Sequence, residues 1–199
     1  MRALATGFEP FGGSAVNPSQ LLVERLAAES PAGIELAVAV LPVSYARAAD
    51  ALAAAVAAAE PELVVCFGQA DGRAGISVER VALNLDDSSS VDNGGAVRAA
   101  EIEPGGPVAC RSTLPVEEIV SALRAQGIPA ATSRDAGGFL CNHVFFVLAR
   151  LLERERPGVR GGFVHVPLLP EQALEQPAPT MPLETLVRAG RIALATAAS

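Results

Sequence analysis

Short apolar runs alternate with longer amphipathic stretches along most of the chain. The apolar runs are typical of buried strands and predict strands at 3–6, 34–41, 63–67, 128–133 and 162–166. The amphipathic stretches predict helices that begin near Asn17, Ser44, Thr113, Leu140 and Pro182. We therefore expect an α/β fold: a single domain over residues 1–199, with a twisted, mixed but mostly parallel sheet and helices on both faces.

Two of these helices carry recognisable starting signals. Asn17, Pro18 and Gln20 resemble a capping box, with asparagine as N-cap and proline at the first helical position. Ser44 is placed to cap an alanine-rich helix that runs to about Glu60.

The middle of the chain departs from this alternation. Residues 76–85 predict a strand pair or hairpin, and a polar segment rich in Asp, Ser, Gly and Pro follows at 86–108. An uninterrupted loop of that length is usually functional or mobile.

Composition and charge exclude several kinds of chemistry. All fifteen basic residues are arginine, so no lysine can form a Schiff base or contact phosphates. Two histidines cannot supply a three-histidine zinc site. The net charge of -7 argues against nucleic acid or an anionic membrane as partner. We expect no signal peptide and no membrane span, and three cysteines without a C-x-x-C pair suit free thiols in the cytoplasm.

The loop Gly7–Ser14 has the spacing of a phosphate-binding loop, but Gly13 stands where that motif needs lysine. A tight turn at a strand end is the simpler interpretation. Phe8 and Phe11 then have two possible roles. They either form the wall of an apolar pocket at the carboxyl ends of the strands or pack into the core.

Cys141 differs from the other two cysteines in its setting. Cys66 lies in an apolar run, and Cys110 has no acid-base partner nearby in sequence. Cys141 opens a predicted helix after Gly137 and Gly138, where the helix dipole favours a thiolate and the glycines offer an oxyanion hole. The alternative is a core cysteine on a buried helix.

A nucleophilic thiol needs a base, and the chain offers two histidines. His143 lies about 200° around the helix from Cys141, which favours a structural role. His165, near the end of an apolar strand, is the better candidate. Glu79 lies between hydrophobic residues and could orient the imidazole, but the pattern alone does not rank it above Asp71 or Asp87.

Several motifs together resemble the pyroglutamyl peptidase I (pyrrolidone-carboxylate peptidase) family of cysteine peptidases. They are Gly7–Gly13, Val16–Ser19, Gly68–Ala70, Glu79–Ala82, Cys141–His143 and Gly161–Pro167, in the family's order. The resemblance implies a phosphorylase/hydrolase-like fold, a cytoplasmic enzyme without metal or cofactor, and a homodimer or homotetramer. It implies Cys141 as nucleophile, His165 as general base and acid, and Glu79 as orienting carboxylate. It also implies a pocket for a pyroglutamyl ring lined by Phe8, Phe11, Asn17, Gln69, Phe139 and Leu140.

The chain departs from the family pattern at one notable position. Ser89–Asn93 reads Ser-Ser-Val-Asp-Asn where the family usually has Arg-Ile-Pro-Asp-Asn. Loss of this arginine implies reduced activity, and a catalytically weakened pyroglutamyl-binding protein of the same fold is the alternative. Neither Arg73 nor Arg80 is assigned a compensating role. Val43 replaces a common threonine and should make the pocket more apolar.

Overall fold

The largest sheet has six strands in the order β2-β1-β3-β10-β4-β9. The computed structural model describes all 199 residues and places these strands at β1 (Arg2–Phe8), β2 (Glu35–Leu41), β3 (Leu63–Gln69), β4 (Ile76–Glu79), β9 (Ala130–Ser133) and β10 (Arg160–Val166). Strands β2, β1, β3 and β10 are parallel, whereas β4 runs antiparallel to β10 and parallel to β9. The expected mixed, mostly parallel sheet is confirmed.

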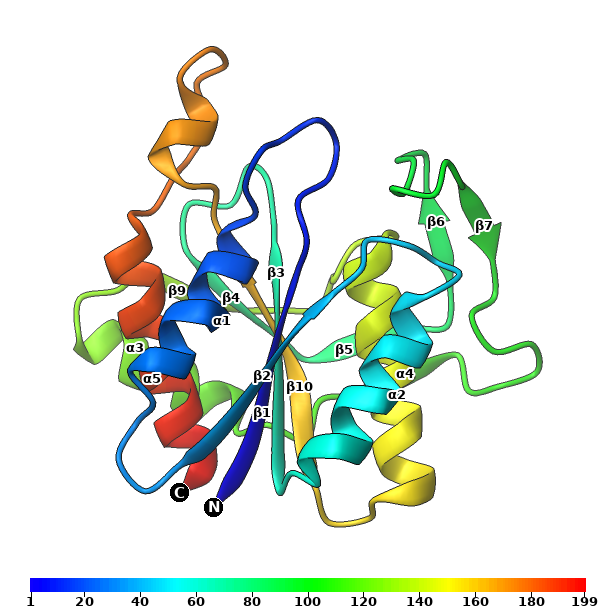
Figure 1. The fold of residues 1–199 in the computed structure, drawn as a ribbon, viewed down its shortest axis with the longest axis horizontal. Coiled ribbons are helices and arrows are strands. Elements are labelled where there is room, and N and C mark those ends of the chain that lie inside the picture. Colours follow the sequence, from blue (N-terminus) through cyan, green and yellow to red (C-terminus); the bar gives the residue numbers. More distant parts are fainter.

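Helices cover both faces of this sheet (Figure 1). One face carries α1 (Pro18–Ala28), α3 (Val116–Ala125) and α5 (Leu183–Ala198), and the other carries α2 (Ala48–Ala59) and α4 (Leu140–Glu155). Each layer has its own apolar core, with Leu22 and Leu194 in the first and Leu52 and Phe145 in the second. Fully burying such a side chain contributes about 1.5–3 kcal/mol, so these cores hold the helices against the sheet. None of the helices is long and apolar enough to span a bilayer.

The helix starts agree with the sequence only in part. Asn17 is the N-cap of α1, and its Oδ1 accepts from Ser19 N at 3.0 Å. Gln20 does not complete the predicted box, because its side chain donates to Glu24 instead. Helix α2 begins at Ala48 rather than at Ser44, because residues 44–47 form a separate turn.

Helix α3 also begins later than predicted, at Val116. The Thr113 amide donates to the Gly161 carbonyl at 3.0 Å, and the Thr113 hydroxyl donates to the same oxygen at 3.2 Å. Thr113 therefore ties the connection before α3 to β10 and is not part of the helix.

The middle of the chain forms two small sheets and is not an uninterrupted loop. Strand β5 (Val81–Leu83) pairs with β8 (Ala109–Arg111), and β6 (Asp86–Ser88) pairs with β7 (Arg98–Ala100), both antiparallel. The predicted hairpin at 76–85 was wrong, because β4 stays in the main sheet while β5 leaves it. The Asp92 carboxylate closes the β6–β7 turn by accepting from the Gly94 and Ala96 amides, and it also accepts from the Tyr45 amide. Figure 1 shows this hairpin projecting from the α4 side of the molecule.

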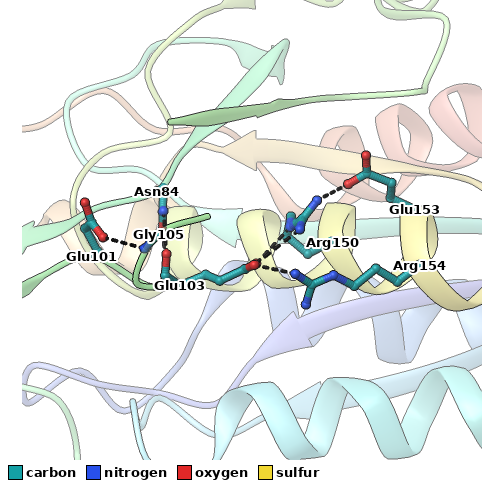
Figure 2. Close-up of polar contacts among 7 residues, drawn as sticks. All are labelled: Asn84, Glu101, Glu103, Gly105, Arg150, Glu153 and Arg154. Carbon is teal, nitrogen blue, oxygen red and sulfur yellow. Dashed lines mark hydrogen bonds and ion pairs between the residues drawn. The ribbon is translucent and has the colours of Figure 1, made fainter. Parts of the chain in front are cut away.

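The segment after β7 is fastened to α4 by Glu103 (Figure 2). The Glu103 carboxylate accepts from Arg150 Nε at 2.8 Å and also pairs with Arg154. The Glu103 backbone exchanges two hydrogen bonds of 2.8 Å with the Asn84 side chain. These contacts join the region between β5 and β6, the connection to β8 and the second half of α4.

Candidate active site

The carboxyl ends of β1, β3 and β10 meet the start of α4 around a cavity of about 240 Å³. Phe8 ends β1, Gln69 ends β3, and His165 is the last residue but one of β10. Helix α4 contributes Leu140 and Cys141 from its first turn. Ligands in open α/β sheets bind at this edge, where parallel strands end together.

Cys141 is the second residue of α4 and lines this cavity. The thiol has room because residue 68 is glycine: a Cβ there would lie 2.7 Å from Cys141 Sγ and 2.7 Å from the Phe163 ring. The other two thiols do not line the cavity, because Cys66 is buried within β3 and Cys110 lies on β8. Of the three thiols, only that of Cys141 lines the cavity.

The environment of this thiol differs from the predicted one. The sequence favours a lowered pKa, because a helix start is electropositive. In the structure, burial and the negative charge of Glu79 raise the pKa of Cys141 to about 12, and the positive charge of Arg73 opposes them only in part. Loss of hydration outweighs the partial charge of the helix end. The expected thiolate was wrong, and the thiol needs a base to accept its proton.

His165 lines the same cavity and is oriented by a carboxylate. Its Nδ1 lies 2.8 Å from Glu79 Oε1. A carboxylate only accepts, so Nδ1 carries the hydrogen and Nε2 keeps its lone pair. Burial lowers the pKa of His165 despite the opposing effect of Glu79, which keeps the ring neutral near pH 7. Neither Asp71 nor Asp87 contacts His165, so Glu79 is its carboxylate partner.

The second histidine is engaged elsewhere. His143 is buried, and its Nδ1 lies 3.0 Å from Asp86 Oδ2. Its ring packs edge-on against Tyr45, and it does not line the cavity. The predicted structural role of His143 is confirmed.

Aromatic and aliphatic side chains form the apolar wall of the cavity. Phe8 is almost fully buried yet still lines the cavity, so both interpretations made from sequence hold for it. The rings of Phe11 and Phe139 lie 5.9 Å apart, centre to centre, and Leu140 and Val43 extend this wall.

Two amide side chains add polar groups to this wall, and one of them is Asn17. Its Oδ1 accepts from the Ser19 amide and hydroxyl, and its Nδ2 donates to the Glu9 carbonyl. One Asn17 amide hydrogen therefore has no partner within the protein.

Gln69 is the second amide, and it is held between two neighbours. Its Nε2 donates to Asp71 Oδ1 at 2.8 Å, and its Oε1 accepts from Gln172 Nε2 at 3.1 Å. Gln172 belongs to the 3-10 helix Pro170–Ala173 and also donates to Ser14 Oγ and the Val16 carbonyl. Sequence reasoning missed Gln172, because it lies in a proline-flanked segment without a motif.

The loop before α4 offers fewer backbone donors than predicted. Gly137 has a φ of +79°, and its amide already donates to Asp135 Oδ1 at 2.9 Å. Gly138 packs so closely against β6 that a Cβ would lie 2.3 Å from the Asp87 carbonyl oxygen. The first amides of α4 have no partner within the helix, so these are the donors that face an oxyanion.

The departure at Ser89 and the loop Gly7–Ser14 can now be located. Ser89 is exposed and does not line the cavity, whereas its neighbour Ser88 does. The loop Gly7–Ser14 is a tight turn, with Gly12 and Gly13 at φ +62° and +80° and the Ser14 amide donating to the Phe11 carbonyl.

A thiol at a helix start and a histidine oriented by a buried carboxylate are the groups that cysteine hydrolases use. Fold and site thus define the class of α/β thiol hydrolases. A family model described as pyroglutamyl peptidase matches residues 1–199. The chain belongs to the pyroglutamyl peptidase family.

Individual relatives agree with this assignment. The pyrrolidone-carboxylate peptidase of Streptomyces coelicolor is 48% identical over 99% of this chain and 92% of that protein. The crystal structure of pyroglutamyl peptidase I from Bacillus amyloliquefaciens matches with a TM-score of 0.96 and 40% identity, over 99% of this chain and 96% of that one. A variant pyrrolidone carboxyl peptidase from Pyrococcus furiosus gives a TM-score of 0.95 and 34% identity, over 100% of this chain and 98% of that one.

Proposed function

We propose that this site hydrolyses the bond after an N-terminal pyroglutamyl (5-oxoproline) residue through a thioester on Cys141. Membership of the family makes the chain a pyroglutamyl peptidase that acts on peptides. The observation that carries the residue assignment is the 2.8 Å pair of His165 and Glu79 in the wall of the cavity that also holds Cys141.

In the first half of the reaction, His165 Nε2 takes the thiol proton while Cys141 Sγ attacks the carbonyl carbon of the pyroglutamyl residue. Glu79 stabilises the imidazolium that forms, and the first amides of α4 donate to the oxyanion. The imidazolium then gives its proton to the leaving amine, the C–N bond breaks, and a thioester remains. In the second half, His165 takes a proton from water, which attacks the thioester. The C–S bond then breaks, the proton returns to the sulfur, and 5-oxoproline leaves.

The cavity suits a small, uncharged ring. Phe8, Phe11, Phe139 and Leu140 supply apolar contacts for its carbons. The ring carbonyl needs a donor, and Asn17 and Gln69 each keep one amide hydrogen that no protein group uses. A substrate that lacks this carbonyl leaves those donors unpaired, which can cost about 10⁴-fold in kcat/KM.

The test is hydrolysis of pyroglutamyl p-nitroanilide by the purified protein, with prolyl p-nitroanilide as the comparison lacking the ring carbonyl. Cys141→Ala should lose activity by about 10⁴-fold or more, and Cys110→Ala, altered outside the cavity, should keep it. Full activity in Cys141→Ala contradicts the residue assignment. Binding of 5-oxoproline in calorimetry without turnover at any pH indicates a catalytically weakened binding protein.

Three further points belong to this proposal. Residues 1–199 form one peptidase domain, since both apolar cores share the six-stranded sheet. The protein works in the cytoplasm, which is supported by three free thiols. It associates into homodimers or homotetramers, and light scattering at several protein concentrations tests this.

A further inference from the structure

The Glu79 carboxylate is fully buried and contacts two other side chains, the His165 ring and the Arg73 guanidinium. Its side chain is 0% exposed, and its Oε2 has no hydrogen-bond partner. Its Oε1 lies 2.8 Å from His165 Nδ1 and 2.6 Å from Arg73 Nη1. A buried charged group needs a hydrogen-bonded partner of opposite charge to offset its lost hydration. The Arg73 guanidinium is that partner, since a neutral imidazole carries no charge.

Arg73 reaches a second part of the site with its other terminal nitrogen. Its Nη2 donates to the Asp135 carbonyl at 2.6 Å, in the loop that leads into α4 and Cys141. The Arg73 side chain is 28% exposed and lines the cavity. One planar guanidinium thus joins the strand of the orienting carboxylate to the loop before the thiol, a geometry for which arginine is better suited than lysine.

We propose that Arg73 is a positioning residue that holds the Glu79 carboxylate directed at His165 and that fixes the loop before Cys141. This inference rests on the proposed function of Cys141, His165 and Glu79. Arg73 acts through these groups and does not itself exchange a proton.

The neighbouring charges give the direction of its effect. His165 faces Glu79, Arg73 and Asp135, and Cys141 faces Glu79, Arg73 and the thiol of Cys66. The positive charge of Arg73 lowers the pKa of both the imidazole and the Cys141 thiol. It therefore keeps the base neutral in weak acid and helps the thiol to lose its proton.

Arg80 does not share this role, although it follows Glu79 directly. Successive residues of an extended chain point to opposite sides, and Arg80 pairs with Glu117 of α3. It does not line the cavity. Arg73, which lies beyond the end of β3, is therefore the arginine that contacts Glu79.

The test combines two variants of Arg73 with a control. Arg73→Gln removes the charge, and Arg73→Lys keeps the charge but not the planar fork. Arg134→Gln is the control, because Arg134 is exposed on the same loop as Asp135 and forms no ion pair. In Arg73→Gln we expect kcat to fall about tenfold or more and the acid limb of kcat/KM to move up by roughly one pH unit.

Arg73→Lys should keep the acid limb of the wild type while losing part of kcat, and Arg134→Gln should match the wild type in both. If Arg73→Gln does not fold, the loss of kcat expected in Arg73→Lys still tests the inference. An unchanged kcat and pH profile in the folded variants overturns the inference, and hydrolysis by the wild type but not by Cys141→Ala leaves the proposed function intact.

A second readout needs no activity. The chain has two histidines, so NMR of the imidazole rings follows His165 and His143 separately. Arg73→Gln should raise the pKa of His165, and the His143 ring, which contacts Asp86 away from the cavity, is the internal reference for the spectra. A His165 titration that does not move overturns the inference, whatever the substrate of the enzyme.

Discussion

Two buried groups in the cavity have pKa values shifted in opposite directions, and one cause explains both. Removal from water disfavours a charge of either sign, so the pKa of the Cys141 thiol rises and that of the His165 imidazole falls. The resting pair is then a neutral thiol and a neutral imidazole. In the proposed reaction the proton moves to His165 during attack, and Glu79 stabilises the imidazolium only as it forms.

This resting state predicts a broad pH optimum for kcat/KM. Protonation of His165 removes the base, and because its pKa is lowered, the acid midpoint should lie below 6.5, the ordinary value for histidine. Activity should persist above pH 9.0, the ordinary value for a thiol, because the pKa of Cys141 is raised to about 12. A pH series with pyroglutamyl p-nitroanilide at constant ionic strength measures both limbs. An acid midpoint above 6.5 would mean that burial does not set the pKa of His165.

At the scale of helices and strands, most local signals were read correctly, apart from the starts of α2 and α3, whereas distant partners were not. The apolar runs predicted β3 and β10, and the helix start at Leu140 placed Cys141 at their carboxyl ends. Strand β5 pairs with β8, far along the chain, and no local pattern carries that information. The same holds for Arg73 and Gln172, whose partners lie on other elements. The only signal in the sequence that pointed to Arg73 was its charge just beyond the end of β3.

The 3-10 helix Pro170–Ala173 predicts an effect on substrate binding. Gln172→Ala removes the donor to Gln69 Oε1, so Gln69 loses the contact that fixes its amide toward the cavity. One such hydrogen bond contributes about 0.5–1.5 kcal/mol, so KM should rise roughly two- to tenfold with little change in kcat. Glu171→Ala, on the same short helix and exposed, should leave both constants unchanged. A fall in kcat at constant KM would place Gln172 in the chemical step and contradict this role.

Across the whole molecule, α4 connects the site to a separate electrostatic clamp. Cys141 lies in its first turn, and Arg150 lies nine positions later, about 14 Å along the axis. Arg150 and Arg154 hold Glu103 and with it the long connection between β7 and β8 (Figure 2). The first turn of α4 therefore holds the thiol, whereas its second half holds the connection between β7 and β8.

The clamp predicts a change in stability without a change in catalysis. Its arginines lower the pKa of Glu103, so the carboxylate stabilises the fold above 4.5, its ordinary value, and loses that effect as the pH falls through the lowered pKa. Glu103→Gln should lower Tm by a few degrees near pH 7, less in high salt, and by progressively less as the pH falls below 4.5. Glu101→Gln is the matched control, because the Glu101 side chain accepts only from the Gly105 amide. Calorimetry gives Tm, and kcat/KM of the folded variant should equal that of the wild type. A loss of Tm that does not shrink as the pH falls below 4.5 would show that Glu103 acts through packing rather than through its charge.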